Sequence, residues 1–341
     1  MRIAVYGAGA MGTILGAYIS RAGVPVDLIS RNEGHVAALN ARGAHIVGTV
    51  DFVQPVRALL PSQMQGEYDL IFLMTKQREN AQSAAFLRGY LRADGAVCTC
   101  QNGLPEPGLA AVLGADRVLG CAVAWGATFV GEVSRLTSDP SALTFSLGAY
   151  GKSGRLADAQ AALGCMGAVT VCDNFIGARW SKLLINSAFS GLSAATGQTF
   201  GEIAGNKASR RVAQRIMKEC IDVAKASGVR VEPVQGHRID RLLDYKGPLK
   251  RALSFRLIPV AMKKHAGLVS GMLRDLQNGR RCEIDFICGA VCRSAGACGV
   301  PAPFNARTVE IVHGIEEGKY AVSPSNIALY ADLFGGKRKK S

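Results

Sequence analysis

Short apolar runs alternate with amphipathic stretches over roughly the first half of the chain. The apolar runs have the length of buried strands, and between them the apolar positions recur with helical spacing. Strands are predicted at 2–6, 26–30, 69–74, 96–100 and 118–124, and helices at about 11–22, 33–42, 78–92 and 105–114. Strands that alternate with helices in this way predict a parallel, doubly wound α/β sheet.

The pattern changes in two steps further along. Residues 131–149 alternate apolar and polar positions around Asp139-Pro140, which predicts an antiparallel hairpin added to the sheet. The run 169–172 predicts one more short strand. From Ile176 the spacing is helical and β-branched runs are few, which predicts an all-α region with helices at 181–195, 207–227, 233–244, 251–276, 281–298 and 303–316.

The first strand runs directly into a glycine-rich turn, Gly7-Ala8-Gly9-Ala10-Met11-Gly12, with G-x-G-x-x-G spacing. In such a turn Gly7 makes the tight bend, Gly9 lets a pyrophosphate approach the backbone, and Gly12 lets the helix pack closely on the strand. The N–H groups at the start of the helix face the phosphates. We therefore predict a Rossmann-type dinucleotide-binding domain over 1–178, an all-α substrate domain over 179–334, and a disordered basic tail over 335–341.

The end of the second strand distinguishes the two nicotinamide dinucleotides. A site for NAD usually ends this strand with an acid that binds the ribose hydroxyl. Here the strand ends in Ser30-Arg31-Asn32, and the only acid nearby, Asp27, comes too early. A guanidinium can hold a 2′-phosphate in a bidentate pair, so we predict NADPH with Arg31 on its phosphate. The alternative is that Arg31 is a solvated surface residue.

Composition bears on compartment and partners. The uncharged run from Ile3 to Ile19 contains four glycines and is too long for a signal peptide, and no other run suits a membrane-spanning helix. Ten cysteines occur without CxxC spacing or a histidine cluster, which predicts free thiols in a reducing compartment and no metal site. A cytoplasmic protein without membrane association is expected.

The positive charge lies in the second half of the chain. Residues 1–150 hold 11 basic and 11 acidic side chains, whereas residues 151–341 hold 29 and 15 and carry the whole net charge of +14. This balance suits an anionic substrate and cofactor, although a solvated helical surface accounts for most of these residues. Nucleic acid binding would call for interleaved aromatics or a reading motif, and aromatics are only 6% of the chain, so no nucleic acid partner is predicted.

Two polar positions follow buried strands of the predicted sheet. Lys76 comes after strand 69–74, and Asn102-Gly103 comes after strand 96–100. Ligands of α/β sheets bind at the carboxyl ends of the strands, so both are candidates for the cofactor cleft, expected between the two domains. The alternatives are that Lys76 caps a strand end and that Asn102-Gly103 is an ordinary turn.

A second group of candidates lies in the helical region. Lys182 and Asn186 are four residues apart on one helix face, and Ser190 extends this stripe. A lysine inside such an apolar helix is costly to bury without a partner or a task, and Glu283 is a candidate partner. Alternatively, Lys182 extends from a surface helix to solvent, and Glu283 is a first-turn residue favoured by the helix dipole.

Taken together, the motifs resemble the ketopantoate reductase (2-dehydropantoate 2-reductase) family over nearly the whole chain. The resemblance rests on the glycine turn, Arg31, Lys76, Gln101-Asn102-Gly103 and Lys182-Leu183-Leu184-Ile185-Asn186. Three later blocks extend it: Ser270-Gly271-Met272-Leu273-Arg274-Asp275, Gly279-Arg280-Arg281-Cys282-Glu283-Ile284-Asp285 and Gly299-Val300-Pro301-Ala302-Pro303-Phe304-Asn305.

The resemblance implies reduction of a small anionic 2-keto acid by NADPH, with ketopantoate as the first candidate. It implies that Lys182 is the general acid and that Glu283 orients Lys182 and the substrate hydroxyl. By the same resemblance, Lys76 attracts anionic groups. Residues implied to hold substrate or cofactor are Asn102, Asn186, Ser190 and Ser270.

Two positions depart from the family pattern. Ser190 stands where the family commonly has a second Asn, and Gly271 stands where it commonly has the second Ser of a pair. Both changes remove hydrogen bonds on the substrate side, so a different 2-keto acid is an alternative substrate. Another NADP-linked dehydrogenase and a non-catalytic NADP(H)-sensing protein also stay open. Helical domains of this type often pair, so a homodimer is possible by analogy.

Overall fold

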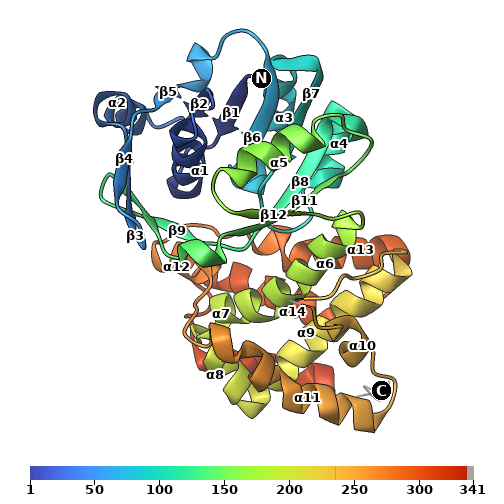
Figure 1. Ribbon diagram of the computed structural model, residues 1–341. Coiled ribbons are helices and arrows are strands. Elements are labelled where there is room, and N and C mark those ends of the chain that lie inside the picture. The colour runs from blue at the N-terminus through green and yellow to red at the C-terminus, as the bar shows by residue number, and fades with distance from the viewer. Residues whose placement is uncertain (235, 336–341) are drawn as a thin grey trace. The chain divides into compact units, whose positions relative to one another are not determined.

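The computed structural model describes residues 1–234 and 236–335 and divides into two compact units, unit 1 (Met1–Phe175) and unit 2 (Ile176–Ser341). Both sheets belong to unit 1, whereas unit 2 is helical (Figure 1). The predicted fold class, a doubly wound α/β domain followed by an all-α domain, is confirmed. The predicted boundary at residue 178 falls inside helix α6 (Phe175–Ile185). Of the predicted tail, residues 336–341 lie outside the described residues.

The larger sheet has eight strands in the order β12-β11-β8-β7-β6-β1-β2-β5. The bounds are β1 (Ile3–Tyr6), β2 (Val26–Ile29), β5 (Arg57–Leu59), β6 (Tyr68–Leu73), β7 (Leu91–Thr99), β8 (Val118–Val123), β11 (Thr144–Ala149) and β12 (Ala168–Val171). All strands from β8 to β5 are parallel to one another, and β11 runs antiparallel to β8. The five strands predicted for the parallel part are present. Strand β5 was not predicted, because it has three residues and only one is buried.

Successive residues of β1 enter two different hydrophobic cores. Ile3 and Val5 pack with residues of α1 (Ala10–Arg21) and α5 (Leu156–Gly164), whereas Ala4 and Tyr6 pack with α3 (Asn80–Arg88) and α4 (Glu106–Leu113). Side chains of a strand alternate between the faces of its sheet, so β1 is covered on both faces. Each fully buried Ile or Val contributes about 1.5–3 kcal/mol, which fixes this strand at the centre of unit 1.

A second, four-stranded sheet corrects one prediction. Its order is β4-β3-β10-β9, with bounds β3 (Ala44–Gly48), β4 (Phe52–Gln54), β9 (Ala127–Val130) and β10 (Val133–Leu136). The predicted hairpin over 131–149 is wrong, because β10 pairs with β9 and β3, whereas β11 joins the larger sheet. Asp139 accepts a hydrogen bond from the Ser141 N–H and caps a 3-10 turn at Pro140–Ala142, which separates the two strands.

Unit 2 contains helices of very different lengths. After α6 they are α7 (Gly191–Thr196), α8 (Phe200–Gly205), α9 (Lys207–Ala226), α10 (Ile239–Leu243), α11 (Pro248–Met262), α12 (Gly271–Gln277), α13 (Cys288–Cys298) and α14 (Pro303–Glu316), with a 3-10 segment at Pro324–Phe334. Within the described residues, no helix combines the length and the apolarity needed to cross a bilayer.

Three predicted helices of this region are shorter or divided. The predicted helix 251–276 divides after Met262, and a new helix begins at Gly271, where the Ser270 hydroxyl accepts the N–H of Leu273. The predicted helix 281–298 begins only at Cys288, after a 3-10 turn at Ile284–Phe286. The helix predicted over 233–244 is limited to α10. Periodicity alone did not reveal these breaks because the apolar spacing continues across them.

Glu219 of α9 joins two helices of unit 2. Glu219 is 8% exposed, and its carboxylate accepts hydrogen bonds from the backbone N–H groups of Phe304 and Asn305, each at 2.9 Å, and from the Asn305 side-chain amide at 2.8 Å. These donors belong to the first turn of α14, whose N–H groups have no partner within the helix. Burial raises the pKa of Glu219 to about 7, although the three donors and Arg215 act in the opposite direction.

The raised pKa of Glu219 predicts how stability changes with pH. Between the ordinary pKa of a glutamate and about 7, the folded protein binds more protons than the unfolded chain, so stability falls as pH rises through this range. We expect the melting temperature to fall more between about pH 5 and pH 7 in the wild type than in Glu219→Gln. His313 and the other titrating groups act in both proteins, and equal slopes would contradict the assignment.

Candidate active site

The three glycines of the turn each have the geometry that the sequence predicts for a dinucleotide. Gly7 has φ +101°, and a Cβ there would lie 2.6 Å from the Thr75 backbone N. A Cβ at Gly12 would lie 2.4 Å from the Gly7 carbonyl oxygen, so α1 could not pack this closely on the turn with a larger residue. A Cβ at Gly9 would meet nothing within 4 Å. The turn therefore leaves open space over Gly9, where a pyrophosphate fits.

The rest of the turn holds the start of α1 in place. The backbone N–H groups of Gly7 and Ala8 donate to the Ile29 carbonyl oxygen at 3.0 and 2.9 Å, which ties the turn to the end of β2. Ala10 and Met11 are the first residues of α1. N–H groups in a first helical turn lack acceptors within the helix and attract anions. These residues fit the phosphates of a dinucleotide.

A cavity of about 500 Å³ continues from this turn along unit 1. Ala8 and Gly9 line it near the turn, and Ser30 and Asn32 line it at the end of β2. Its other lining residues are Gly34, His35, Ala38, Phe129, Gly131 and Glu132. The volume and the mixture of apolar and polar groups suit a nucleoside moiety.

Two residues of this cavity were not candidates from the sequence. The rings of His35 and Phe129 meet edge to face with their centres 5.2 Å apart, and burial lowers the pKa of His35. Phe129 comes from β9 of the smaller sheet and His35 from α2 (Glu33–Arg42). Phe129 lies between the predicted strand 118–124 and the predicted hairpin 131–149, where no element was predicted, so no pattern indicated that it approaches α2.

Arg31, which follows β2, forms an ion pair with Glu79. Arg31 Nη1 lies 2.7 Å from Glu79 Oε2, and both side chains are well exposed. Asp27 is buried and accepts a hydrogen bond from the Tyr68 hydroxyl at 2.7 Å, so its carboxylate is engaged in the interior of unit 1. The exclusion of Asp27 as a ribose ligand agrees with this position.

Gln101 joins the two strand ends that carry Lys76 and Asn102. Its side-chain amide donates to the Thr75 carbonyl oxygen at 2.8 Å and to Asn80 Oδ1 at 2.7 Å, and its oxygen accepts from Asn80 at 2.9 Å. Asn102 is half-buried and its backbone carbonyl accepts the Gln77 side chain. Lys76 is exposed and directly precedes the 3-10 helix Gln77–Glu79. Both predicted residues therefore stand on a rigid edge of the sheet.

The predicted stripe of unit 2 is present, with a change in helix type. Lys182, Asn186 and Ser190 are each half-buried, whereas the residues that flank them on the inner face are buried. Asn186–Ser190 form a π-helical turn between α6 and α7, where one continuous α-helix was predicted. Such turns widen a helix locally and are frequent at functional sites.

Glu283 lies on a segment that packs against this π-helical turn. The Cys288 thiol donates to the Ser187 carbonyl oxygen at 3.5 Å, and Ile284 Cδ1 lies 4.0 Å from where a Cβ at Gly191 would stand. Glu283 is half-buried and precedes a 3-10 turn, so it does not begin an α-helix as predicted.

Ser270 has a structural task in this unit. It is 3% exposed, its hydroxyl caps α12, and its N–H donates to the Ser193 hydroxyl at 3.2 Å. Its contact with substrate stays a prediction. Gly271 is exposed, and a Cβ there would meet nothing within 4 Å.

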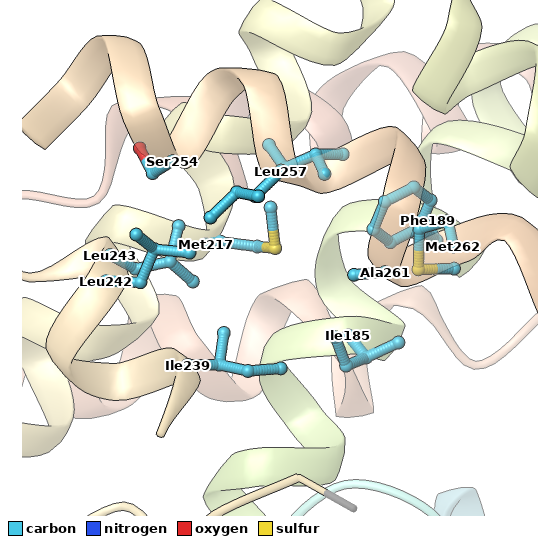
Figure 2. Close-up of a pocket in the computed structure, with 11 residues that line it drawn as sticks. Ile185, Phe189, Met217, Ile239, Leu242, Leu243, Ser254, Leu257, Ala261 and Met262 are labelled. Carbon is cyan, nitrogen blue, oxygen red and sulfur yellow. The ribbon is translucent and has the colours of Figure 1, made fainter. Parts of the chain in front are cut away.

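Residues of α6 and of the π-helical turn Asn186–Ser190 line an apolar cavity of about 60 Å³ (Figure 2). Ile185 and Phe189 line it from the helix that carries the stripe, and Met217 lines it from α9. The remaining lining residues are Ile239, Leu242, Leu243, Ser254, Leu257, Ile258, Ala261 and Met262. Among these lining residues of the described chain, Ser254 is the polar one, and Gln214 donates to its hydroxyl at 2.6 Å. A cavity this small and apolar belongs to the packing of unit 2.

Comparisons with known proteins cover both units. Residues 3–148 match the family model described as "Ketopantoate reductase PanE/ApbA", and residues 174–316 match "Ketopantoate reductase PanE/ApbA C terminal". A 2-dehydropantoate 2-reductase of Pyrococcus horikoshii is 26% identical and aligns with 89% of this chain and 94% of its own length. One from Streptococcus pyogenes serotype M3 is 26% identical over 93% of this chain and 98% of its own length.

Two solved structures share the fold. A PanE/ApbA family ketopantoate reductase from Ralstonia eutropha JMP134 has a TM-score of 0.77 and 28% identity, and the match covers 94% of this chain and 99% of that one. D-mandelate dehydrogenase with NADH and anilino(oxo)acetate has a TM-score of 0.78 and 21% identity, covering 93% and 99%. The second likeness concerns the fold alone.

The open space over Gly9 gives a direct test of the dinucleotide site. In Gly9→Ala the new methyl group meets no protein atom, so the melting temperature should stay unchanged, but the methyl group occupies the space of the pyrophosphate. We expect the affinity for reduced nicotinamide dinucleotides, measured by fluorescence titration, to fall about tenfold or more. Gly108→Ala, in open space on α4, is the matched control. Unchanged affinity in Gly9→Ala would place the cofactor elsewhere.

Proposed function

The chain belongs to the ketopantoate reductase family, and we propose that it reduces 2-dehydropantoate (ketopantoate) to pantoate with NADPH, a step of pantothenate biosynthesis. The observation that carries the proposal is the half-buried stripe Lys182, Asn186 and Ser190, whose helix changes to a π-helical turn at the polar positions. The family is enzymatic, and its named relatives are nicotinamide-dependent oxidoreductases. A protein of this class needs a proton donor beside a carbonyl group.

We assign the cofactor to unit 1. The turn Gly7–Gly12 supplies bare backbone and the helix start for the pyrophosphate, and Arg31 supplies a cation for the 2′-phosphate of NADPH. Lys76 adds positive charge and Asn102 a polar group at the neighbouring strand ends. The absence of an acid at the end of β2 supports NADPH. When bound, the cofactor supplies a hydride to the C2 carbonyl carbon of the keto acid.

We assign the proton transfer to Lys182. As the C2 carbonyl becomes an alkoxide, the ammonium group stabilises the negative oxygen and then donates a proton from Nζ to it, which completes the hydroxy acid. Lys182 regains its proton from solvent. Glu283 orients the ammonium group and the substrate hydroxyl, and Asn186, Ser190 and Ser270 hold the polar groups of the substrate. The excess of basic residues after residue 150 favours the carboxylate of such a substrate.

A different 2-keto acid is the alternative substrate. Ser190 and Gly271 offer fewer substrate-side hydrogen bonds than the family pattern, and a neighbour in fold is named for mandelate, an aryl-substituted 2-hydroxy acid. Oxidation of NADPH with ketopantoate, compared with a panel of larger 2-keto acids, decides between them. Binding of NADPH without turnover of any keto acid would instead favour a non-catalytic NADP(H)-sensing protein.

We also propose that the protein is cytoplasmic. Ten cysteines, all within the described part of the chain, form no disulfide with one another, which suits a reducing compartment. Burial raises the pKa of Cys292 to about 11 and that of Cys282 to about 12, so these two thiols are unreactive. A homodimer and the lack of a nucleic acid partner stay predictions.

Removal of the proposed proton donor should affect the reaction and leave the cofactor bound. In Lys182→Ala we expect kcat to fall about 10²–10⁴-fold, because general acid catalysis is lost, with the dissociation constant for NADPH unchanged. Lys207→Ala, an exposed lysine at the start of α9, is the charge-matched control. Turnover retained in Lys182→Ala would assign the proton transfer to another residue.

Restoring the family's polar groups should change substrate preference. We expect Ser190→Asn and Gly271→Ser together to raise kcat/KM for ketopantoate relative to larger 2-keto acids by about tenfold, because polar groups of the substrate regain partners. Gly271 has open space for the new side chain, so folding should be unaffected. Parallel kinetics with both substrates give the ratio, and an unchanged ratio would mean that these positions do not contact substrate.

A further inference from the structure

The cation proposed for the 2′-phosphate already has an anionic partner. Arg31 Nη1 lies 2.7 Å from Glu79 Oε2, and the two side chains are 66% and 41% exposed. An arriving cofactor can therefore reach both charges. Because Glu79 is an anion, it competes with a phosphate for the same guanidinium.

Glu79 also lies close to the dinucleotide turn. Burial raises the pKa of Tyr6, the charge of Arg31 acts to lower it, and the charge of Glu79 acts to raise it. Tyr6 is the last residue of β1 and directly precedes Gly7. The two charges that act on Tyr6 therefore stand together beside the turn, although they come from segments far apart in the sequence.

The segment that carries Glu79 is anchored on both sides. The Gln77 side chain donates to the Asn102 carbonyl oxygen, and the Asn80 side chain exchanges two hydrogen bonds with Gln101. Gln77 is buried. The two neighbours of Glu79 on this segment thus anchor its backbone to the edge of the sheet, which keeps the carboxylate within reach of Arg31.

We propose that Glu79 is a specificity-determining residue that weakens the preference for NADPH, so that the site also binds NADH. The proposal rests on the assignment of the cofactor to unit 1. A 2′-phosphate must take Arg31 from Glu79 and then lie beside an uncompensated carboxylate. A 2′-hydroxyl can instead donate a hydrogen bond to Glu79, which replaces the acid that an NAD site usually carries at the end of β2.

Direct binding of the two cofactors tests this role without any keto acid. The full-length protein is titrated with NADPH and with NADH, following nicotinamide fluorescence. We expect the wild type to bind both with dissociation constants within about tenfold of each other. In Glu79→Gln we expect tighter NADPH binding, unchanged or weaker NADH binding, and a ratio changed by about tenfold, which corresponds to about 1.4 kcal/mol.

Two further variants and one control make the test specific. Glu79→Lys should move the ratio further toward NADPH, and Arg31→Ala should weaken NADPH binding alone. Glu67→Gln removes the same charge from an exposed position of unit 1 and should leave both affinities unchanged. Equal changes for both cofactors, or none, in Glu79→Gln and Glu79→Lys would overturn the proposal. A failure of the proposed reductase activity would appear separately, as cofactor binding without turnover.

Discussion

The arrangement of unit 1 depends on the burial of strand β1 on both faces. This strand pairs in parallel with β2 on one side and β6 on the other. The chain continues from β1 to β2 in one direction and later returns to β6 in the other, so the strand order reverses at β1. Ligands of open α/β sheets bind at such a reversal, beyond the carboxyl ends of the strands. The glycine-rich turn Gly7–Gly12 begins at this reversal, directly after β1.

The same constraint explains why residues distant in sequence meet there. Arg31 follows β2, Lys76 and Glu79 follow β6, and Asn102 follows β7, because parallel strands end at one edge of the sheet. Gln101 cross-links two of these strand ends. The polar edge is thus a consequence of the topology, and in the proposed function the residue types at each strand end determine which dinucleotide is bound.

The sequence predicts the elements that are long, apolar and strictly periodic. It predicts the parallel strands, the tight bend at Gly7 and the close packing at Gly12, because both features require the absence of a Cβ. It does not predict β3, β4 and β5, which are short and half-exposed, or the partners of β10, which depend on pairing between distant segments. The ion pair of Glu79 with Arg31 is not predicted for the same reason, because Arg31 is 48 positions earlier in the chain.

In the helical unit 2, the sequence predicts which residues share a helix face, but it does not predict the local helix geometry. The spacing of Lys182, Asn186 and Ser190 predicts a shared face, but not the π-helical turn at Asn186–Ser190, because residues four apart are also expected on one face of a continuous α-helix. Ser270 caps α12, a role that a family pattern does not separate from substrate binding.

Transfer of isotope tests the central claim most directly. NADPH labelled with deuterium at the reactive position of its nicotinamide is mixed with the protein and ketopantoate, and the product is analysed by mass spectrometry. The account predicts pantoate with one deuterium at C2. Consumption of the label without a labelled hydroxy acid, from ketopantoate or from any other 2-keto acid, would contradict it.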